Sequence, residues 1–167
     1  MSFPKLRIGV MGGSECTKDA YQLGEQVGRL IALHEAVLIC GGRDGIMEAA
    51  AKGAKEAGGL TVGILPGGTD LGANAFIDIP IVTGMGDARN MINVLSSHVI
   101  IAINGGFGTL SEIALALKTQ TPVVGLHTWR FTIDPQPEGM QRLLFKADTA
   151  EGAVSKAVDL AKRSRTL

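Results

Sequence analysis

The sequence predicts an α/β protein with a Rossmann-like three-layer fold, in which helices flank a mostly parallel sheet of about six or seven strands. Short apolar runs alternate along the chain with helical stretches of ten or more residues, which is typical of right-handed β-α-β units. Glycine accounts for 23 of the 167 residues, and the glycines gather where the apolar runs end. We therefore expect a single domain over residues 1–167, with its ligand site at the carboxyl ends of the strands.

The first half of the chain contains four apolar runs that predict strands: Leu6–Met11, Ala36–Cys40, Leu60–Leu65 and Ile79–Thr83. The first run leads into an amphipathic helix, and the second leads into a helix of small residues that a glycine pair ends. Polar residues and glycines separate the third run from the fourth, which indicates a surface loop.

The next segment predicts a helix followed by a buried strand. Asp87 is the expected N-cap of the helix. Its apolar residues, which we expect to face the core, are Ala88, Ile92 and Leu95. Val99–Ile103 is apolar without interruption, which is typical of a parallel strand covered on both faces.

The rest of the chain continues the alternation. A helix follows the glycine-rich residues 104–109, and Pro122–Leu126 predicts a further strand. Trp129–Met140 carries two prolines and little periodicity, so we interpret it as a loop or lid. The strand Leu143–Ala147 and a helix near the end of the sequence complete the predicted fold.

The glycine-rich turn after Val99–Ile103 is the best candidate for a phosphate site. It lies between a buried strand and a helix, so its amides lack helical partners and can point at an anion. Glycine also permits the positive φ and the close approach that such a turn needs. No Gly-Lys-Ser or Gly-Lys-Thr follows, which excludes a P-loop. The predicted ligand-binding residues of this turn are Gly105, Gly106, Phe107, Gly108 and Thr109.

Two charged residues are candidates for chemistry at this turn. Glu112 shares a helix face with Thr109, and that face points back at the turn. Arg89 carries a planar guanidinium that suits a phosphate or a carboxylate. Two alternatives stay open: Glu112 is an acid favoured by the helix dipole or it acts on the ligand, and Arg89 is a surface arginine or binds the ligand. Further candidates at the same edge are Gly12, Gly13, Ser14, Gly41, Gly42, Arg43 and Asn90.

Composition excludes several classes of function. The 16 Lys and Arg residues balance the 16 Asp and Glu residues, so we expect no nucleic-acid partner and no acidic membrane partner. No signal peptide and no apolar run of about 18 residues is present, which predicts a cytoplasmic protein. Cys16 and Cys40 have no spacing that suggests a disulfide or a metal site. Residues 9–14 fail the G-x-G-x-x-G spacing, which argues against a nicotinamide oxidoreductase.

Three segments together resemble a known superfamily. Gly41–Met47, Arg89–Asn90 and Gly105–Glu112 are similar to the LONELY GUY and molybdenum-cofactor carrier proteins, and the resemblance runs from about Lys5 to Ala161. It implies a Rossmann-like fold and a homodimer or homotetramer.

The resemblance implies one of two functions. LONELY GUY proteins are phosphoribohydrolases that remove the base from a nucleoside 5′-monophosphate, and Glu112 and Arg89 match their catalytic positions. That branch has Arg-Lys where this chain has Arg89-Asn90, and Pro where it has Asn104. The segment Met91–Leu117 looks closer to the carrier branch, whose turn holds the phosphate of a pterin cofactor.

Our leading hypothesis is therefore a binding or carrier protein for a small phosphorylated ligand, either a nucleoside monophosphate or a molybdopterin-type compound. We expect it to require no further cofactor and no metal. The alternative is the phosphoribohydrolase, and if the protein is an enzyme we expect this N-glycosidase chemistry.

Overall fold

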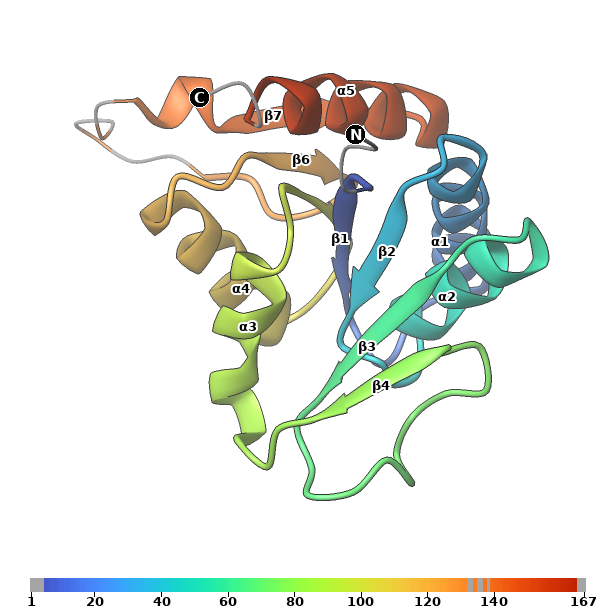
Figure 1. Cartoon of the computed structure of the whole chain (residues 1–167). Helices are drawn as coiled ribbons and strands as arrows, with labels where there is room; N and C mark the ends of the chain where they lie inside the picture. Colours follow the sequence, from blue (N-terminus) through green and yellow to red (C-terminus); the bar gives the residue numbers. More distant parts are fainter. Residues whose placement is uncertain (1–4, 132–133, 135–136, 138, 165–167) are drawn as a thin grey trace.

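The computed structural model of the chain describes residues 5–131, 134, 137 and 139–164. In this part of the chain seven strands form one sheet in the order β4-β3-β2-β1-β5-β6-β7, and every neighbouring pair is parallel (Figure 1). The predicted α/β sheet is thus confirmed. The strands are β1 (Arg7–Gly12), β2 (Val37–Cys40), β3 (Thr61–Leu65), β4 (Ile79–Val82), β5 (Val99–Ile103), β6 (Val123–Leu126) and β7 (Leu144–Ala147).

Helices cover both faces of the sheet, which confirms the three-layer arrangement. In Figure 1, α1, α2 and α5 lie on one side of the strands, and α3 and α4 lie on the other. The helices are α1 (Lys18–Leu33), α2 (Ile46–Glu56), α3 (Asn90–Leu95), α4 (Phe107–Lys118) and α5 (Ala150–Arg163), with short 3-10 helices η1 (Gly86–Arg89) and η2 (Met140–Arg142).

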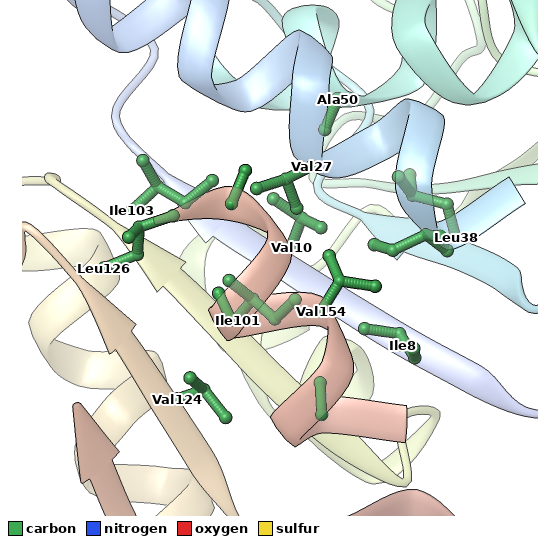
Figure 2. Packing of buried hydrophobic residues seen from close by; sticks show 14 of the residues in the cluster. Ile8, Val10, Val27, Leu38, Ala50, Ile101, Ile103, Val124, Leu126 and Val154 are labelled. Atoms are coloured by element: carbon green, nitrogen blue, oxygen red, sulfur yellow. The ribbon is translucent and has the colours of Figure 1, made fainter. Parts of the chain in front are cut away.

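The core is divided between the two faces of β5. Ile101 and Ile103 point toward α1, α2 and α5, where Figure 2 shows them with Val27, Ala50 and Val154. Alternate residues of β5 pack on the other face, against α3 and α4. All five residues of the strand are fully buried, as its continuous apolar run predicts.

Two helices begin at threonine N-caps. The hydroxyl of Thr17 accepts a hydrogen bond from the amide of Ala20 at the start of α1, at 3.2 Å. The hydroxyl of Thr149 accepts one from the amide of Gly152 at the start of α5, at 3.1 Å. Each cap satisfies an amide that has no partner within its helix, so it fixes where the helix starts.

The helices α1 and α2 pack backbone to backbone. A Cβ on Gly28 would overlap the carbonyl oxygen of Ala50, and a Cβ on Gly53 would overlap the carbonyl oxygen of Glu25. Gly28 of α1 and Gly53 of α2 are therefore required by the close approach of the two helices. This tight pair holds the carboxyl ends of β1 and β2 next to each other.

The predicted helix at Asp87 is wrong in its start and in two of its three inward residues, whereas Ile92 is half-buried and packs on the core as predicted. The chain forms η1 and then α3, and Met85 stands at the start of η1 without a capping side chain. Ala88 is exposed, and Leu95 is 61% exposed. The segment buries apolar Val94 in the core. It also buries three polar residues at or beside the site described below: Arg89, Asn90 and Asn93.

The segment Trp129–Met140 has no helix or strand among its described residues before η2. Residues 132, 133, 135, 136 and 138 lie outside the described part, so its interpretation as a lid stays a prediction. No helix in the described ranges is both long enough and apolar enough to cross a membrane.

Candidate functional site

A cavity of about 250 Å³ lies at the carboxyl ends of β1, β2 and β5. This is the edge where the sequence predicted the ligand site. The predicted residues that line the cavity are Gly12, Gly13, Ser14, Gly41, Arg43, Arg89, Asn90, Gly106, Gly108, Thr109 and Glu112. The structure therefore brings together segments that are far apart in the sequence.

Three predicted residues lie beside this cavity without lining it. Gly42 has φ +73° and packs against Gly63 of β3. Gly105 has φ +94°, and the side chain of Thr109 fills the space that a Cβ there would need. The side chain of Phe107 is 82% exposed. Gly42 and Gly105 thus shape the turns that form the cavity wall.

The glycine turn directs the N-terminus of α4 into the cavity. Gly106 is the N-cap residue, and no side chain caps the helix there. The first helical bond runs from the amide of Leu110 to the carbonyl of Gly106, at 3.0 Å. The amides of residues 106–109 precede it, so they have no helical partner and favour an anion together with the positive end of the helix dipole.

Arg89 lies buried at the end of η1. Its Nη1 donates a hydrogen bond to the carbonyl of Ile64, at 2.8 Å. Its Nε is buried and has no partner among the described residues. Burial lowers the pKa of Arg89, and the charge of Glu112 opposes this. The guanidinium remains charged at neutral pH and keeps one buried N–H without an acceptor.

Glu112 is buried on α4 and only 6% exposed. Its Oε1 accepts a hydrogen bond from Nδ2 of Asn93, at 2.8 Å. Burial raises the pKa of Glu112 to about 7, against the Asn93 hydrogen bond and the charge of Arg89, which both lower it. No ion pair within 4.0 Å joins Glu112 to Arg89 in the described residues. Glu112 therefore exchanges a proton near neutral pH.

Two asparagines connect α3 to α4. Asn93 is fully buried and holds Glu112, and its Oδ1 has no partner among the described residues. Nδ2 of Asn90 donates to Oγ of Ser111, at 2.9 Å. The sequence suggests that Asn93, like Asn90, could bind a base or a sugar, with an exposed residue as the alternative, and the predicted site residues include Asn90 but not Asn93. The spacing along the sequence could have identified Asn93 as a site residue, because Arg89 and Asn93 are four residues apart and share a helix face.

Other groups at or near the cavity include two thioethers, a second carboxylate and a buried thiol. Met11, Met47 and Asp87 also line it. Cys40 is fully buried, and burial raises the pKa of its thiol to about 12, so the thiolate is not formed at neutral pH. In the described part of the chain no group of three His, Cys, Asp or Glu side chains could hold a metal ion.

The segment after β6 contacts the glycine turn from the other side. Nε1 of Trp129 donates to the carbonyl of Gly106, at 3.3 Å. The ring of Trp129 lies 6.0 Å from the ring of Phe107, centroid to centroid, at an angle of 36°. The hydroxyl of Thr128 donates to the carbonyl of Asn104. These contacts fix the position of the turn.

Solved structures of similar proteins cover nearly the whole chain. The molybdenum cofactor binding protein from the phototrophic bacterium Rippkaea orientalis is 44% identical, with a TM-score of 0.86 over 95% of this chain and 99% of that one. The molybdenum cofactor carrier protein from Chlamydomonas reinhardtii is 41% identical, with a TM-score of 0.79 over 95% of this chain and 99% of that one.

The chain is also 53% identical to an uncharacterized protein from Archaeoglobus fulgidus, over 72% of this chain and 80% of that protein. Together these findings confirm the predicted superfamily and, within it, the likeness to the carrier branch. The model of the SLOG cluster4 family matches residues 5–159, and the chain belongs to this family.

Proposed function

We propose that this protein binds the molybdenum cofactor by its phosphate group and carries it. The observation that supports this most directly is the open N-terminus of α4, which meets the buried guanidinium of Arg89 in one cavity. The cofactor is cargo, so no further cofactor is required. The relatives named for binding or carrying this cofactor support the assignment.

The residues of the cavity fit a phosphate-bearing pterin. The free amides of α4 and the unpartnered Nε of Arg89 are donors, and a phosphate offers several acceptor oxygens. A Cβ on Gly41 would overlap Nη1 of Arg89, so this glycine leaves room for the guanidinium. A phosphate on the α4 amides places the rest of the ligand among the walls that η1, α3, β1 and the turn after β2 provide.

Glu112 supplies a group that suits the ring of a pterin. With a pKa of about 7, it is protonated in a large fraction of molecules at neutral pH. A protonated carboxyl donates one hydrogen bond and accepts others, which matches the carbonyl, amino and ring-nitrogen groups of a pterin.

The phosphoribohydrolase is the less favoured alternative. The similar solved proteins described above are named for cofactor binding or carriage. Where the hydrolase branch has a lysine, this chain has Asn90, whose amide is engaged with Ser111. Removal of the base from AMP, GMP, CMP, IMP or UMP by the purified protein, and its loss in Glu112→Gln, would establish the hydrolase instead.

Cofactor binding can be tested with a matched pair of aspartate substitutions. Gly106 has φ −96°, and a Cβ there meets no atom within 4 Å, so we expect Gly106→Asp to be compatible with the fold. An aspartate N-cap also stabilises the helix while it places a carboxylate where the phosphate binds. Gly72→Asp adds the same charge on the exposed loop after β3 and is the control.

We expect the wild type and Gly72→Asp to retain the cofactor through gel filtration, and Gly106→Asp to lose it at an unchanged or higher melting temperature. Equal retention by all three proteins would contradict the phosphate site. Absence of the cofactor from the wild type would contradict the carrier function.

We also propose that the protein is a cytoplasmic homodimer or homotetramer. All four residues of the edge strand β4 are exposed, although they are apolar. Met85, in the turn after β4, and Leu95, at the end of α3, are further exposed apolar side chains, at 50% and 61%. Such a surface on an edge strand favours association. Light scattering should give a multiple of the chain mass for the wild type and the monomer mass for Ile81→Lys. A monomeric wild type would contradict this proposal.

A further inference from the structure

A second cavity, of about 420 Å³, lies over the carboxyl ends of β6 and β7. Its volume is in the range that small-molecule sites occupy. Three aromatic side chains line it: Trp129, Phe131 and Phe145. Aromatic walls of this kind suit a planar ring, which stacks on them or packs against their edges.

Charged side chains also line this second cavity. Arg130, Lys146 and His127 are its basic residues, and Asp148 is its carboxylate. Nζ of Lys146 lies 2.9 Å from the carboxylate of Asp148, and both side chains are mostly exposed. An exposed pair contributes little to stability, so Lys146 is available to a ligand anion. The lining therefore combines a surface for a ring with donors for an anionic linker.

The glycine turn lines the first cavity and is hydrogen-bonded to two residues that line the second. Gly106 lines the first cavity, and its carbonyl accepts the hydrogen bond of Trp129, which lines the second. Thr128, also in the second cavity, donates to Asn104 at the start of the turn. A phosphate on the amides of this turn is thus one hydrogen-bonded residue away from the wall of the second cavity.

The strand order places this turn at the centre of the sheet. The chain moves outward from β1 through β2, β3 and β4, and then returns to β5 on the other side of β1. At such a reversal, a ligand with two halves lies across the carboxyl ends of the strands, with its phosphates in the middle. Here the first cavity lies at the carboxyl ends of β1, β2 and β5, and the second lies over β6 and β7, on the β5 side of β1.

We propose that the second cavity holds a nucleoside joined to the pterin through the phosphate, so that the preferred cargo is a dinucleotide form of the cofactor. The inference rests on the proposed function. The pterin half occupies the first cavity, the bridging phosphates lie on the α4 amides, and the nucleoside base packs on Trp129.

The test compares two fluorescent probes: the oxidised pterin monophosphate of the cofactor, and the same compound extended by guanosine monophosphate. We expect the extended probe to bind about tenfold more tightly, the order that one base on one aromatic ring provides. Trp129→Ala should reduce this ratio to about one, and Trp129→Phe, which keeps a ring, should preserve most of it. The ratio is informative because damage to the shared turn weakens both probes equally.

Lys146→Ala should also lower the ratio, and Lys118→Ala, at the far end of α4, should leave it unchanged. Equal affinity for the two probes in the wild type would overturn this inference and leave the carrier function intact. A ratio that stays the same in Trp129→Ala would also overturn it. Binding of neither probe would refute the carrier function itself, and this inference with it.

Discussion

The guanidinium of Arg89 occupies the space that a side chain at position 41 would need. A Cβ on Gly41 would overlap Nη1 of Arg89 and come within 2.6 Å of the sulfur of Met47. Both obstacles are ends of flexible side chains, so the fold can tolerate a larger residue here, whereas the arginine cannot keep its position. The hydrogen bond from Nη1 to the carbonyl of Ile64 depends on this glycine.

Gly41→Ala should therefore weaken cofactor binding in the same way as a substitution of Arg89 itself. We expect Gly41→Ala and Arg89→Ala each to weaken cofactor binding by about tenfold or more, the loss of one charge-assisted contact. The double variant should be no weaker than Arg89→Ala alone, because both substitutions remove the same interaction. Titration calorimetry on the four proteins checks this. Additive losses would mean that Gly41 contributes through its own backbone.

The pH dependence of cofactor binding should follow Glu112. Its pKa is raised to about 7 because the carboxyl is buried, so it is neutral below pH 7 and ionised above it. An anionic ligand in the same cavity favours the neutral form. Affinity should then fall about fivefold between pH 6 and pH 8 if the pKa of Glu112 rises by one unit on binding.

Glu112→Gln should remove this fall, because glutamine does not titrate. The phosphate of the ligand titrates near pH 6, and Glu112→Gln reports that contribution by itself. An identical pH profile in the two proteins would show that Glu112 does not face the ligand.

Asn93 should set the pH at which this change occurs. Its amide donates to Glu112 and stabilises the carboxylate, so Asn93→Ala removes a hydrogen bond that lowers the pKa. The midpoint of the pH profile should rise by about one unit. Carbon-13 NMR of labelled glutamate measures the pKa of Glu112 directly. A midpoint at or below the wild-type value would contradict this role for Asn93.

Substitution by alanine at two neighbouring glycines of the turn should change the free energy of unfolding by very different amounts. Gly105 has φ +94°, and a Cβ there would overlap the side chain of Thr109. Gly105→Ala should lower the free energy of unfolding by about 2 kcal/mol or more. Gly106 has φ −96° and open space around it, so Gly106→Ala should change that free energy by less than about 1 kcal/mol. Urea denaturation of both variants checks the contrast.

The sequence predicted those parts of the fold that depend on local patterns. The continuous apolar run of β5 predicted its bounds, because burial on both faces requires every residue to be apolar. The glycine turn after β5 was also predicted, since a strand, glycines and a helix in succession have few other arrangements.

The face of η1 and α3 could not be predicted from the sequence. Hydrophobicity places Ala88 and Leu95 inside, but the segment instead buries Arg89 and Asn93. These polar side chains are stable inside because Ile64 and Glu112 provide partners from other elements. The residues next to Arg89 and Asn93 in the sequence do not indicate which distant residues will form these hydrogen bonds. The same applies to Gly42, whose position follows from β3 beside it.

The amides of α4 bind a phosphate through dipoles, whose electric field falls off within a short distance. The chain as a whole adds no net charge, because its 16 positive and 16 negative residues cancel. Such a protein attracts its ligand weakly from a distance, so ionic strength should change the rate of capture little. Transfer of the ligand to a recipient protein then depends on short-range contacts. The ligand moves when the hydrogen-bond donors of the recipient bind the phosphate more tightly than the amides of this turn do.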